Sequence, residues 1–158
     1  QDMAAIESVI VAAFRHATHA SHTEQFIVRA LRDSGQLSVS LVAVASGKVI
    51  GHVALSPVTI SSGPAHWYGL GPVSVAPAHQ GQGVGSRLIG QAFTQLHNLG
   101  ASGCVVLGDP AYYARFGFKA EPSLVLPAVP PQYFQAIAFV DSVPSGTVSY
   151  HEAFASKG

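Results

Sequence analysis

The spacing of hydrophobic residues predicts a helix directly after a glycine-rich turn, from Val84 to Leu99. Apolar side chains recur there at steps of three and four, and polar side chains fall mostly on the other side. Gly100 can adopt the left-handed conformation that ends a helix. One face of this helix is therefore expected to pack on a sheet. The apolar residues are Val84, Leu88, Ile89, Ala92, Phe93, Leu96 and Leu99.

Two amphipathic helices are predicted near the N-terminus. Asp2 can cap the first, and a second is expected from about Thr23 to Arg32, with Ser21 or His22 near its start and Gly35 after its end. No strand pattern precedes the first helix, and the chain lacks an initiator Met. The inward residues of the two helices are Ile6, Val9, Ile10, Ala13 and Phe14, and then Phe26, Ile27, Ala30 and Leu31.

A hairpin and an interrupted strand follow these helices. Strands are expected at Val39 to Ala45 and Lys48 to Ile60, joined by a tight turn at Ser46-Gly47. The next strand, His66 to Val75, contains glycine and proline, which indicate a bulge or the close approach of another backbone. The interrupting residues are Gly69, Gly71 and Pro72.

The C-terminal half continues the alternation of strand and helix. A strand is expected at Ser102 to Leu107 and a short helix at Pro110 to Arg115. Two or three more strands are expected, around Phe118, at Phe134 to Val140 and at Thr147 to Tyr150. Mixed elements in a chain of 158 residues, 48% of them hydrophobic, predict one α/β (α+β) domain over residues 1–158.

The charge and the cysteine content limit the kinds of partner that the protein is expected to have. Only 10% of the residues are charged, eight of each sign, so no net field favours nucleic acid or an anionic membrane. The sole cysteine, Cys104, lies in an apolar run and is expected to be a buried, inert thiol. No apolar run reaches the roughly eighteen residues that span a bilayer, and the start is not a signal peptide, so a cytoplasmic location is expected.

The glycine-rich turn, Gln80 to Ser86, lies between the strand that ends at Val75 and the helix that begins at Val84. Glycines at alternate positions let backbone N–H groups converge on an anion, with the positive end of the helix behind them. The turn therefore predicts a phosphate site and a ligand that carries a pyrophosphate.

Two common phosphate-binding patterns do not fit this turn. A P-loop needs Lys followed by Ser or Thr after the last glycine, but the chain continues as Ser86-Arg87. A dinucleotide-binding turn needs the pattern G-x-G-x-x-G and an acid about twenty residues later. Here the glycines stand at 81, 83 and 85, and no acid occurs before Asp109. A glycine-rich connection without a ligand is the remaining alternative.

The surroundings of the turn resemble the acyl-CoA-binding motif of the GCN5-related N-acetyltransferase (GNAT) superfamily. That motif is Gln/Arg-x-x-Gly-x-Gly/Ala, and the run Val73 to Leu88 carries it with Gln80, Gly83 and Gly85 at the defining positions. A single motif of this kind is modest evidence, so the rest of the chain matters.

A second signature lies downstream of the first. Ala111 to Phe118 is similar to the aromatic pair followed by x-x-x-Gly-Phe of the same family. The longer run Val106 to Phe118, together with Pro131 to Phe134, resembles the YhbS-like bacterial branch. The resemblance covers nearly the whole chain.

The resemblance implies a GNAT fold and acetyl-CoA as the acyl donor. In that fold a mixed central sheet with flanking helices splays between its fourth and fifth strands, which opens a slot for the pantetheine arm. The sequence is expected to lack the first strand. The implied contacts are the main chain of Val73, Ser74 and Val75 with pantetheine, and Gln80, Gly81, Gln82, Gly83, Val84, Gly85 and Ser86 with the pyrophosphate. Arg87 either adds charge there or is a solvated helix residue.

The resemblance also implies a proton donor for the leaving thiolate. Tyr113 stands four residues before Gly117, matching the family's tyrosine beside the CoA sulfur, and an ordinary phenol is a reasonable acid for this step. Tyr112 is expected to pack the short helix.

The sequence does not decide which group accepts the proton of the amine. Many family members place a Glu in the fourth strand, but His66 to Gly71 contains no acid. His52, His66, Asp109 or a chain of waters are the alternatives, and Asp109 could instead cap the short helix.

Three histidines recur every third residue between the first two helices, at His16, His19 and His22. No acid or cysteine cluster completes a metal site, so no metal is expected, and these side chains could instead touch the acceptor.

The function expected from the resemblance is transfer of an acetyl group from acetyl-CoA to a primary amine by direct attack in a ternary complex. The acceptor would be a small-molecule amine or a peptide. The alternative is a non-catalytic acyl-CoA-binding or regulatory module, because the strand acid is missing. A homodimer through the segment Phe134 to Val140 is a further possibility.

Overall fold

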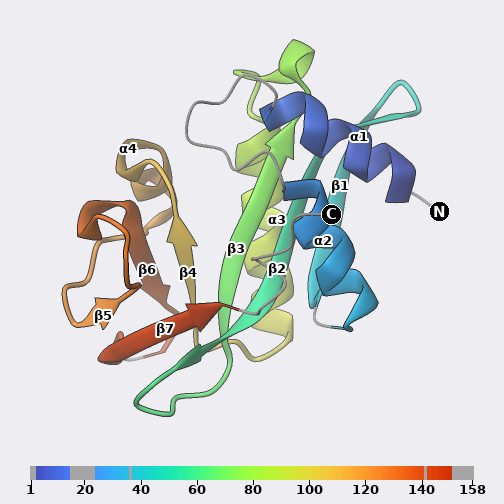
Figure 1. The fold of residues 1–158 in the computed structure, drawn as a ribbon. Helices are drawn as coiled ribbons and strands as arrows, with labels where there is room; N and C mark the ends of the chain where they lie inside the picture. The colour runs from blue at the N-terminus through green and yellow to red at the C-terminus, as the bar shows by residue number, and fades with distance from the viewer. Residues whose placement is uncertain (1–2, 15–23, 36, 141, 151–158) are drawn as a thin grey trace.

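The computed structural model describes residues 3–14, 24–35, 37–140 and 142–150 of the chain (Figure 1). In this part, seven strands form one mixed sheet, and helices cover both of its faces. The expected α/β fold class with a splayed sheet and flanking helices is confirmed. Several residues named in the sequence analysis lie outside the described residues: Asp2, Ser21 and the three histidines His16, His19 and His22. The side chains of Ala13 and Phe14 also lie outside them.

The sheet has the strand order β5-β7-β2-β3-β4-β6, and β1 pairs with the first half of β2. Neighbouring strands are parallel at β3–β4 and at β5–β7, and antiparallel at the other pairs. The strands are β1 (Val39–Ala45), β2 (Lys48–Ile60), β3 (Trp67–Val75), β4 (Gly103–Leu107), β5 (Leu124–Val125), β6 (Phe134–Ala138) and β7 (Gly146–Tyr150).

Alternate residues of β2 point to opposite faces of the sheet, so each face has its own apolar contacts with helices. Val53 and Leu55 share a core with the apolar side of the helix α3 (Val84–Asn98). Ala54 lies between them in sequence and packs with Ile6 and Val28 of the helices α1 (Met3–Phe14) and α2 (Glu24–Asp33). The short helix α4 (Pro110–Tyr113) follows β4 and continues into a 3₁₀ turn, Ala114–Phe116.

The predicted hairpin of β1 and β2 is confirmed with its bounds. Ser46 and Gly47 both have positive φ, at 51° and 77°, the conformation that a two-residue turn needs to match the twist of its strands.

The predicted interruption of the third strand is also confirmed. The pairing of β2 with β3 passes from Val53 and Val73 to Leu55 and Leu70, so Gly71 and Pro72 together face Ala54. Below this bulge, β3 pairs with β4 over Trp67 to Leu70. Above it, β3 has no strand neighbour on the β4 side among the described residues, and the two strands diverge toward the end that carries α4 (Figure 1). This is the splay that the resemblance implied.

Two expectations from the sequence were wrong. Leu99 is 49% exposed, because α3 ends at Asn98 and the chain turns away from the sheet. The strand expected around Phe118 is a single bridge between Lys119 and Ala136. The sequence pattern also missed β5, whose two residues form a strand only through their pairing with β7.

The edge strand β6 is partly covered by the chain itself. Lys119 and Ala136 exchange two backbone hydrogen bonds, of 3.0 and 2.8 Å, at the centre of β6. The edge predicted to pair with a second copy is therefore occupied at its middle residue.

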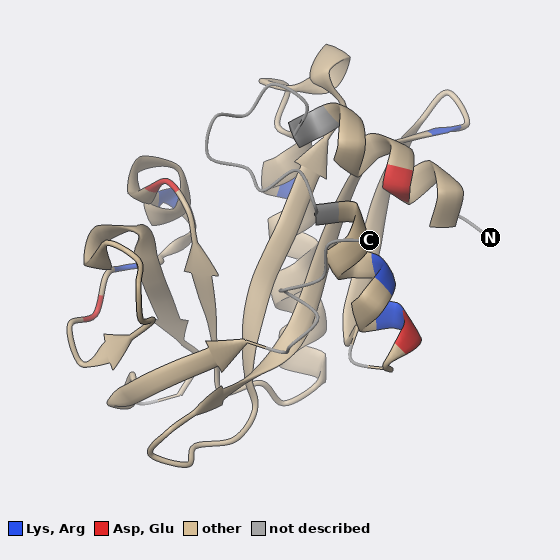
Figure 2. Cartoon of the chain, in the orientation of Figure 1, with Lys and Arg blue, Asp and Glu red and all other residues tan. Residues whose placement is uncertain are grey.

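Charged residues lie mainly on helices and loops (Figure 2). Apart from Lys48 at the start of β2, the strands contain no Lys, Arg, Asp or Glu. In the described part of the chain, no helix is both long enough and apolar enough to cross a membrane.

Candidate active site

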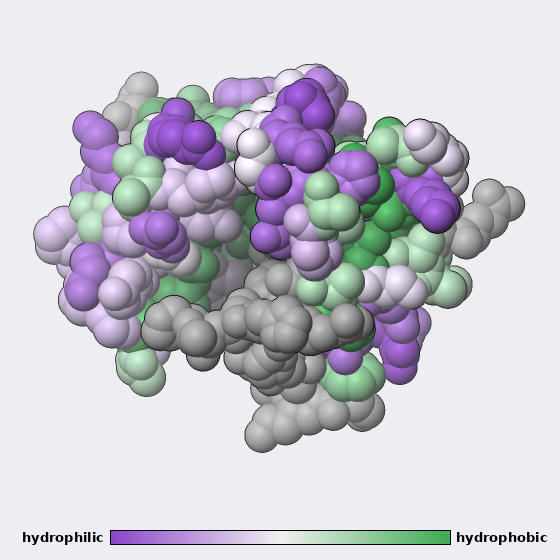
Figure 3. All heavy atoms as spheres, turned by 90° about the horizontal axis from the view of Figure 1, so that it is seen from above, coloured by the Kyte–Doolittle hydropathy of each residue, from purple (hydrophilic) through white to green (hydrophobic). Residues whose placement is uncertain are grey.

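A pocket of about 320 Å³ lies at the end of β3, where the glycine-rich turn meets α4 and the 3₁₀ turn behind it. Seen from above, this end of the molecule has hydrophilic side chains at its surface and hydrophobic atoms deeper between them (Figure 3). Tyr112 and Arg115 line one side of the pocket. Its other lining residues belong to the end of β3 and the turn: Val75, His79, Gln80, Gly81, Gly83, Val84, Gly85 and Ser86.

The second and third glycines of the turn are required for different reasons. Gly83 is the N-cap of α3 and has a φ of 82°, a left-handed conformation that costs most residues energy. A Cβ at position 85 would lie only 2.8 Å from the hydroxyl oxygen of Tyr112. Gly83 therefore shapes the start of the helix, and Gly85 lets α4 approach it.

Gln80 fixes the turn to the strand that precedes it. Its side-chain amide donates a hydrogen bond of 2.9 Å to the carbonyl oxygen of Val75. The residue at this motif position therefore holds the end of β3 and the turn in one arrangement.

Main-chain N–H and C=O groups of β3 face the gap between β3 and β4. Ala76 donates to the carbonyl of Ile50 across the β2–β3 ladder, and bonded residues alternate along an antiparallel pair. Val73 and Val75 therefore direct their N–H and C=O groups away from β2, whereas Ser74 is bonded to His52. Because Gln80 occupies the Val75 carbonyl, the groups that have no partner in the described part of the chain are the N–H and C=O of Val73 and the N–H of Val75.

Tyr113 lies on α4 beside the end of β4. Its ring packs so closely on Gly108 that a Cβ there would be 2.5 Å from the ring, and it meets the Phe118 and Tyr112 rings edge-on. Burial raises the pKa of Tyr113 from 10.0 to about 12, with smaller contributions from Tyr112, Cys104 and Asp109. The phenol is therefore protonated at neutral pH and can act as a hydrogen-bond donor.

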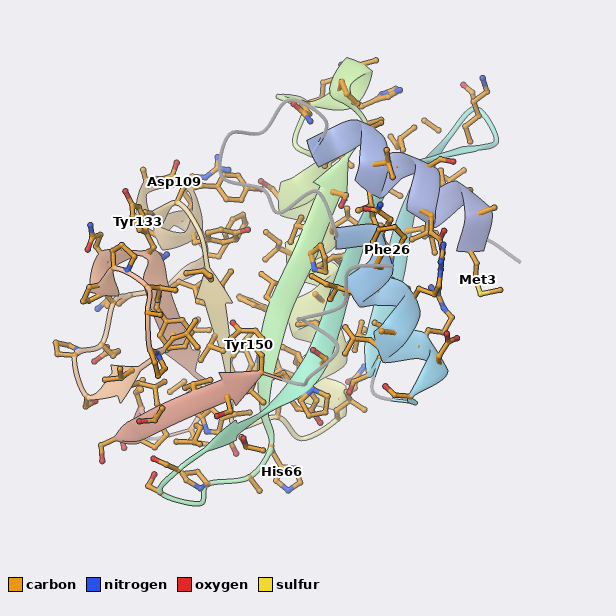
Figure 4. The ribbon with its side chains drawn as sticks, in the orientation of Figure 1. Met3, Phe26, His66, Asp109, Tyr133 and Tyr150 are labelled. Atoms are coloured by element: carbon orange, nitrogen blue, oxygen red, sulfur yellow. The ribbon has the colours of Figure 1, made fainter. Side chains whose placement is uncertain are left out.

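Two of the candidate bases are His66, which lies away from the splay, and Asp109, whose carboxylate already accepts a hydrogen bond. His66 is exposed at the start of β3, and Figure 4 shows it at the opposite end of the molecule from Asp109. The Asp109 carboxylate accepts a hydrogen bond of 2.9 Å from the N–H of Ala111, which makes it the cap of α4.

His52 is the third candidate and is fully buried on β2. Its Nε2 lies 2.7 Å from the Ser40 hydroxyl, while its Nδ1 has no hydrogen-bond partner. Burial, and then the charge of Arg32, lower the pKa of His52 from 6.5 to about 4. This imidazole is neutral at pH 7 and a weak base.

β3, which contains no acidic residue, also has no room for an acidic side chain at position 69. A Cβ on Gly69 would lie 2.6 Å from the ring of Tyr150, at the end of β7. Tyr150 thus covers this part of β3, as its labelled position in Figure 4 shows.

Sequence reasoning missed three lining residues of the pocket: His79, Tyr112 and Arg115. The available signal was the spacing of Tyr112 and Arg115, three residues apart in a predicted helical turn, which places them on one side. Arg87, in contrast, is exposed on α3 and does not line the pocket. Cys104 is fully buried as predicted, and burial raises the pKa of its thiol.

Comparison with known proteins accounts for this arrangement. Residues 3–118 match the model of the acetyltransferase (GNAT) family. The chain belongs to the GNAT family. This GNAT enzyme is 36% identical over 141 residues to the N-acetyltransferase YhbS of Escherichia coli K12, an alignment that covers 85% of this chain and 84% of YhbS.

Solved structures of GNAT proteins share its fold. A GNAT acetyltransferase from Brucella melitensis, in complex with acetyl-CoA, is 49% identical with a TM-score of 0.87, over 98% of this chain and 92% of that one. YhbS from Escherichia coli, in complex with CoA, is 33% identical with a TM-score of 0.87, over 99% and 88%. An aminoglycoside 6′-N-acetyltransferase complexed with coenzyme A is 11% identical with a TM-score of 0.65, over 89% and 92%, and shows the fold alone.

Proposed function

We propose that this GNAT acetyltransferase moves the acetyl group of acetyl-CoA to a primary amine by direct attack in a ternary complex. The observation that carries the proposal is the pocket at the glycine-rich turn, which suits a pyrophosphate. We assign the edge of β3 beyond its pairing with β4 to the pantetheine amides, and the Tyr113 phenol on α4 to the thioester. The two similar structures bound to acetyl-CoA or CoA support this donor.

The cofactor would be bound largely by main-chain groups. N–H groups of the turn, backed by the positive end of α3, suit the pyrophosphate. Val73 and Val75 can pair with the pantetheine amides as an added strand would, because no described strand pairs with them on that side. The predicted contacts with Gly81 to Ser86 and with the Val73 to Val75 main chain stay part of this proposal.

In the reaction, the neutral amine attacks the thioester carbonyl carbon and the C–S bond then breaks. The thiolate takes a proton from the Tyr113 hydroxyl, whose pKa of about 12 makes it a weaker acid than an ordinary phenol, and the amide nitrogen loses its extra proton. Tyr113 is reprotonated from solvent, so the products are the amide and free CoA thiol.

Water is the proposed acceptor of the amine proton. A base works best when its pKa lies near the working pH, and a His52 pKa of about 4 is some three units too low at pH 7. His66 lies at the opposite end of the molecule from Asp109, and the Asp109 Oδ1 already accepts the N–H of Ala111, so neither is assigned this role. The amine must therefore enter in its neutral form, with its proton passed to solvent.

Replacing Tyr113 with phenylalanine tests the proposal. We expect Tyr113→Phe to lower kcat for acceptor-dependent thiol release by about 10²-fold, the usual range for general acid catalysis, with CoA affinity nearly unchanged. Tyr133→Phe is the matched control, because Tyr133 is 44% exposed and lies outside the pocket. A panel of amines with wild-type protein supplies the acceptor for the measurement.

The alternative, a non-catalytic acyl-CoA-binding module, predicts a different outcome. It would bind acetyl-CoA normally but release no thiol with any amine of the panel. Equal rates for wild type and Tyr113→Phe would instead remove Tyr113 from the chemistry and leave the acetyltransferase proposal in place.

A further inference from the structure

Arg115 is a cation on the wall of the cofactor pocket opposite the glycine-rich turn. Its guanidinium lies over the Tyr112 ring at 4.6 Å and beside the Phe116 ring at 5.6 Å. Its Nε donates a hydrogen bond of 3.3 Å to the carbonyl oxygen of Tyr112. Stacking and this bond fix the plane of the group and leave its four terminal N–H donors available.

The charge of Arg115 has no compensating partner among the described residues. The salt bridge found there joins Arg29 to Glu7, on the two N-terminal helices. Asp109, at the start of α4, accepts from the N–H of Ala111. An exposed arginine is ordinarily a mobile, solvated side chain, so holding one against a pocket without an acid implies an anion as its partner.

Tyr112 contacts both Arg115 and the glycine-rich turn. The Tyr112 hydroxyl closely approaches Gly85, and Arg115 stacks on the same ring. An anion on the N–H groups of the turn would therefore have Arg115 on its other side. Arg87 is exposed on α3 and is not among the residues that line the pocket, although its Nη1 lies 3.6 Å from the place of a Cβ on Gly83.

We propose that Arg115, held by Tyr112, binds the pyrophosphate of the CoA donor from the side opposite the glycine-rich turn. This inference rests on the proposed function, since it takes acetyl-CoA as the donor. It makes Arg115 a donor-binding residue, and it gives Tyr112 a positioning role for that residue.

Affinities for CoA and for dephospho-CoA test the proposal, because both carry the pyrophosphate and only CoA carries the 3′-phosphate. Titration calorimetry on the full chain would compare wild type, Arg115→Gln and the matched control Arg87→Gln. We expect Arg115→Gln to weaken both ligands by about the same factor, roughly 10-fold for a charge-assisted contact, and Arg87→Gln to weaken them by less than about 2-fold. Arg115→Lys, which keeps the charge but not the planar stack, is expected to fall between them.

Each other result overturns the inference. A loss for CoA alone would assign Arg115 to the 3′-phosphate, and no loss for either ligand would make it a surface residue. An equal loss in Arg87→Gln would show only a general effect of positive charge. If Arg115→Gln lowered the melting temperature and Arg115→Lys bound both ligands as weakly as Arg115→Gln, the role would be structural. Wild-type protein that binds neither ligand would instead overturn the proposed function.

Discussion

At the scale of single residues, His52 shows how burial changes the chemistry of a side chain. It lies on β2 with one ring nitrogen beside the Ser40 hydroxyl and the other without a partner, and its pKa is about 4. In the unfolded chain the pKa returns to about 6.5, so the unfolded state binds more protons between these two values.

This difference predicts an acid-sensitive fold. The stability contribution of His52 is complete above about pH 6.5 and is lost as the pH falls toward 4, by about 3 kcal/mol over the whole window. Urea unfolding at pH 7 and pH 4.5 would measure the loss in wild type and in His52→Gln, which keeps a hydrogen-bonding group for Ser40 but does not titrate. We expect a smaller loss in the variant. Identical losses would mean that His52 takes up its proton in the folded protein as well.

At the scale of elements, α3 contains two glycines with opposite surroundings. Gly85 faces the hydroxyl of Tyr112, whereas nothing lies within 4 Å of a Cβ placed on Gly90, which is exposed on the same helix. Alanine is favoured over glycine inside a helix by about 1 kcal/mol, so the surroundings decide the outcome of each substitution.

We expect Gly90→Ala to stabilise the protein by about 0.5–1 kcal/mol without changing its affinity for CoA. Gly85→Ala should instead weaken CoA binding by roughly 10-fold, because the new methyl group displaces Tyr112 from the pocket wall. Thermal unfolding and CoA titration of the two variants provide the measurement. Unchanged CoA affinity in Gly85→Ala would show that Tyr112 moves aside without consequence for the pocket.

At the scale of the whole molecule, the donor would join elements that otherwise have few contacts with each other. β3 and β4 separate above the bulge, and the pocket is lined from the turn on one side and from α4 on the other. A ligand in the splay would replace the missing pairing between the two halves of the sheet.

Acetyl-CoA is therefore expected to raise the melting temperature. At a concentration of about 100 times Kd the linkage free energy is about 2.7 kcal/mol, which corresponds to roughly 5–10 °C for a chain of this length. The shift should grow with the logarithm of concentration. A melting temperature that does not depend on acetyl-CoA would contradict donor binding to the folded state.

Much of the fold could be predicted because its signals are local. The hairpin of β1 and β2, the interrupted β3 and the apolar side of α3 follow from spacing and turn residues within each segment. β5 and the bridge at Lys119 could not be predicted, because two short segments become a strand or a bridge only through partners distant in sequence.

The sequence by itself determined the glycine-rich turn, the second signature at Tyr112 to Phe118, and through them the family and the expected donor. Only the tertiary structure decided which side chains share the pocket. It placed Arg115 on the pocket wall and Arg87 outside the lining residues, and it filled the space at Gly69 with Tyr150. The physical reason is that motif spacing fixes the backbone locally, whereas charge, burial and room for a side chain depend on elements that meet only after folding.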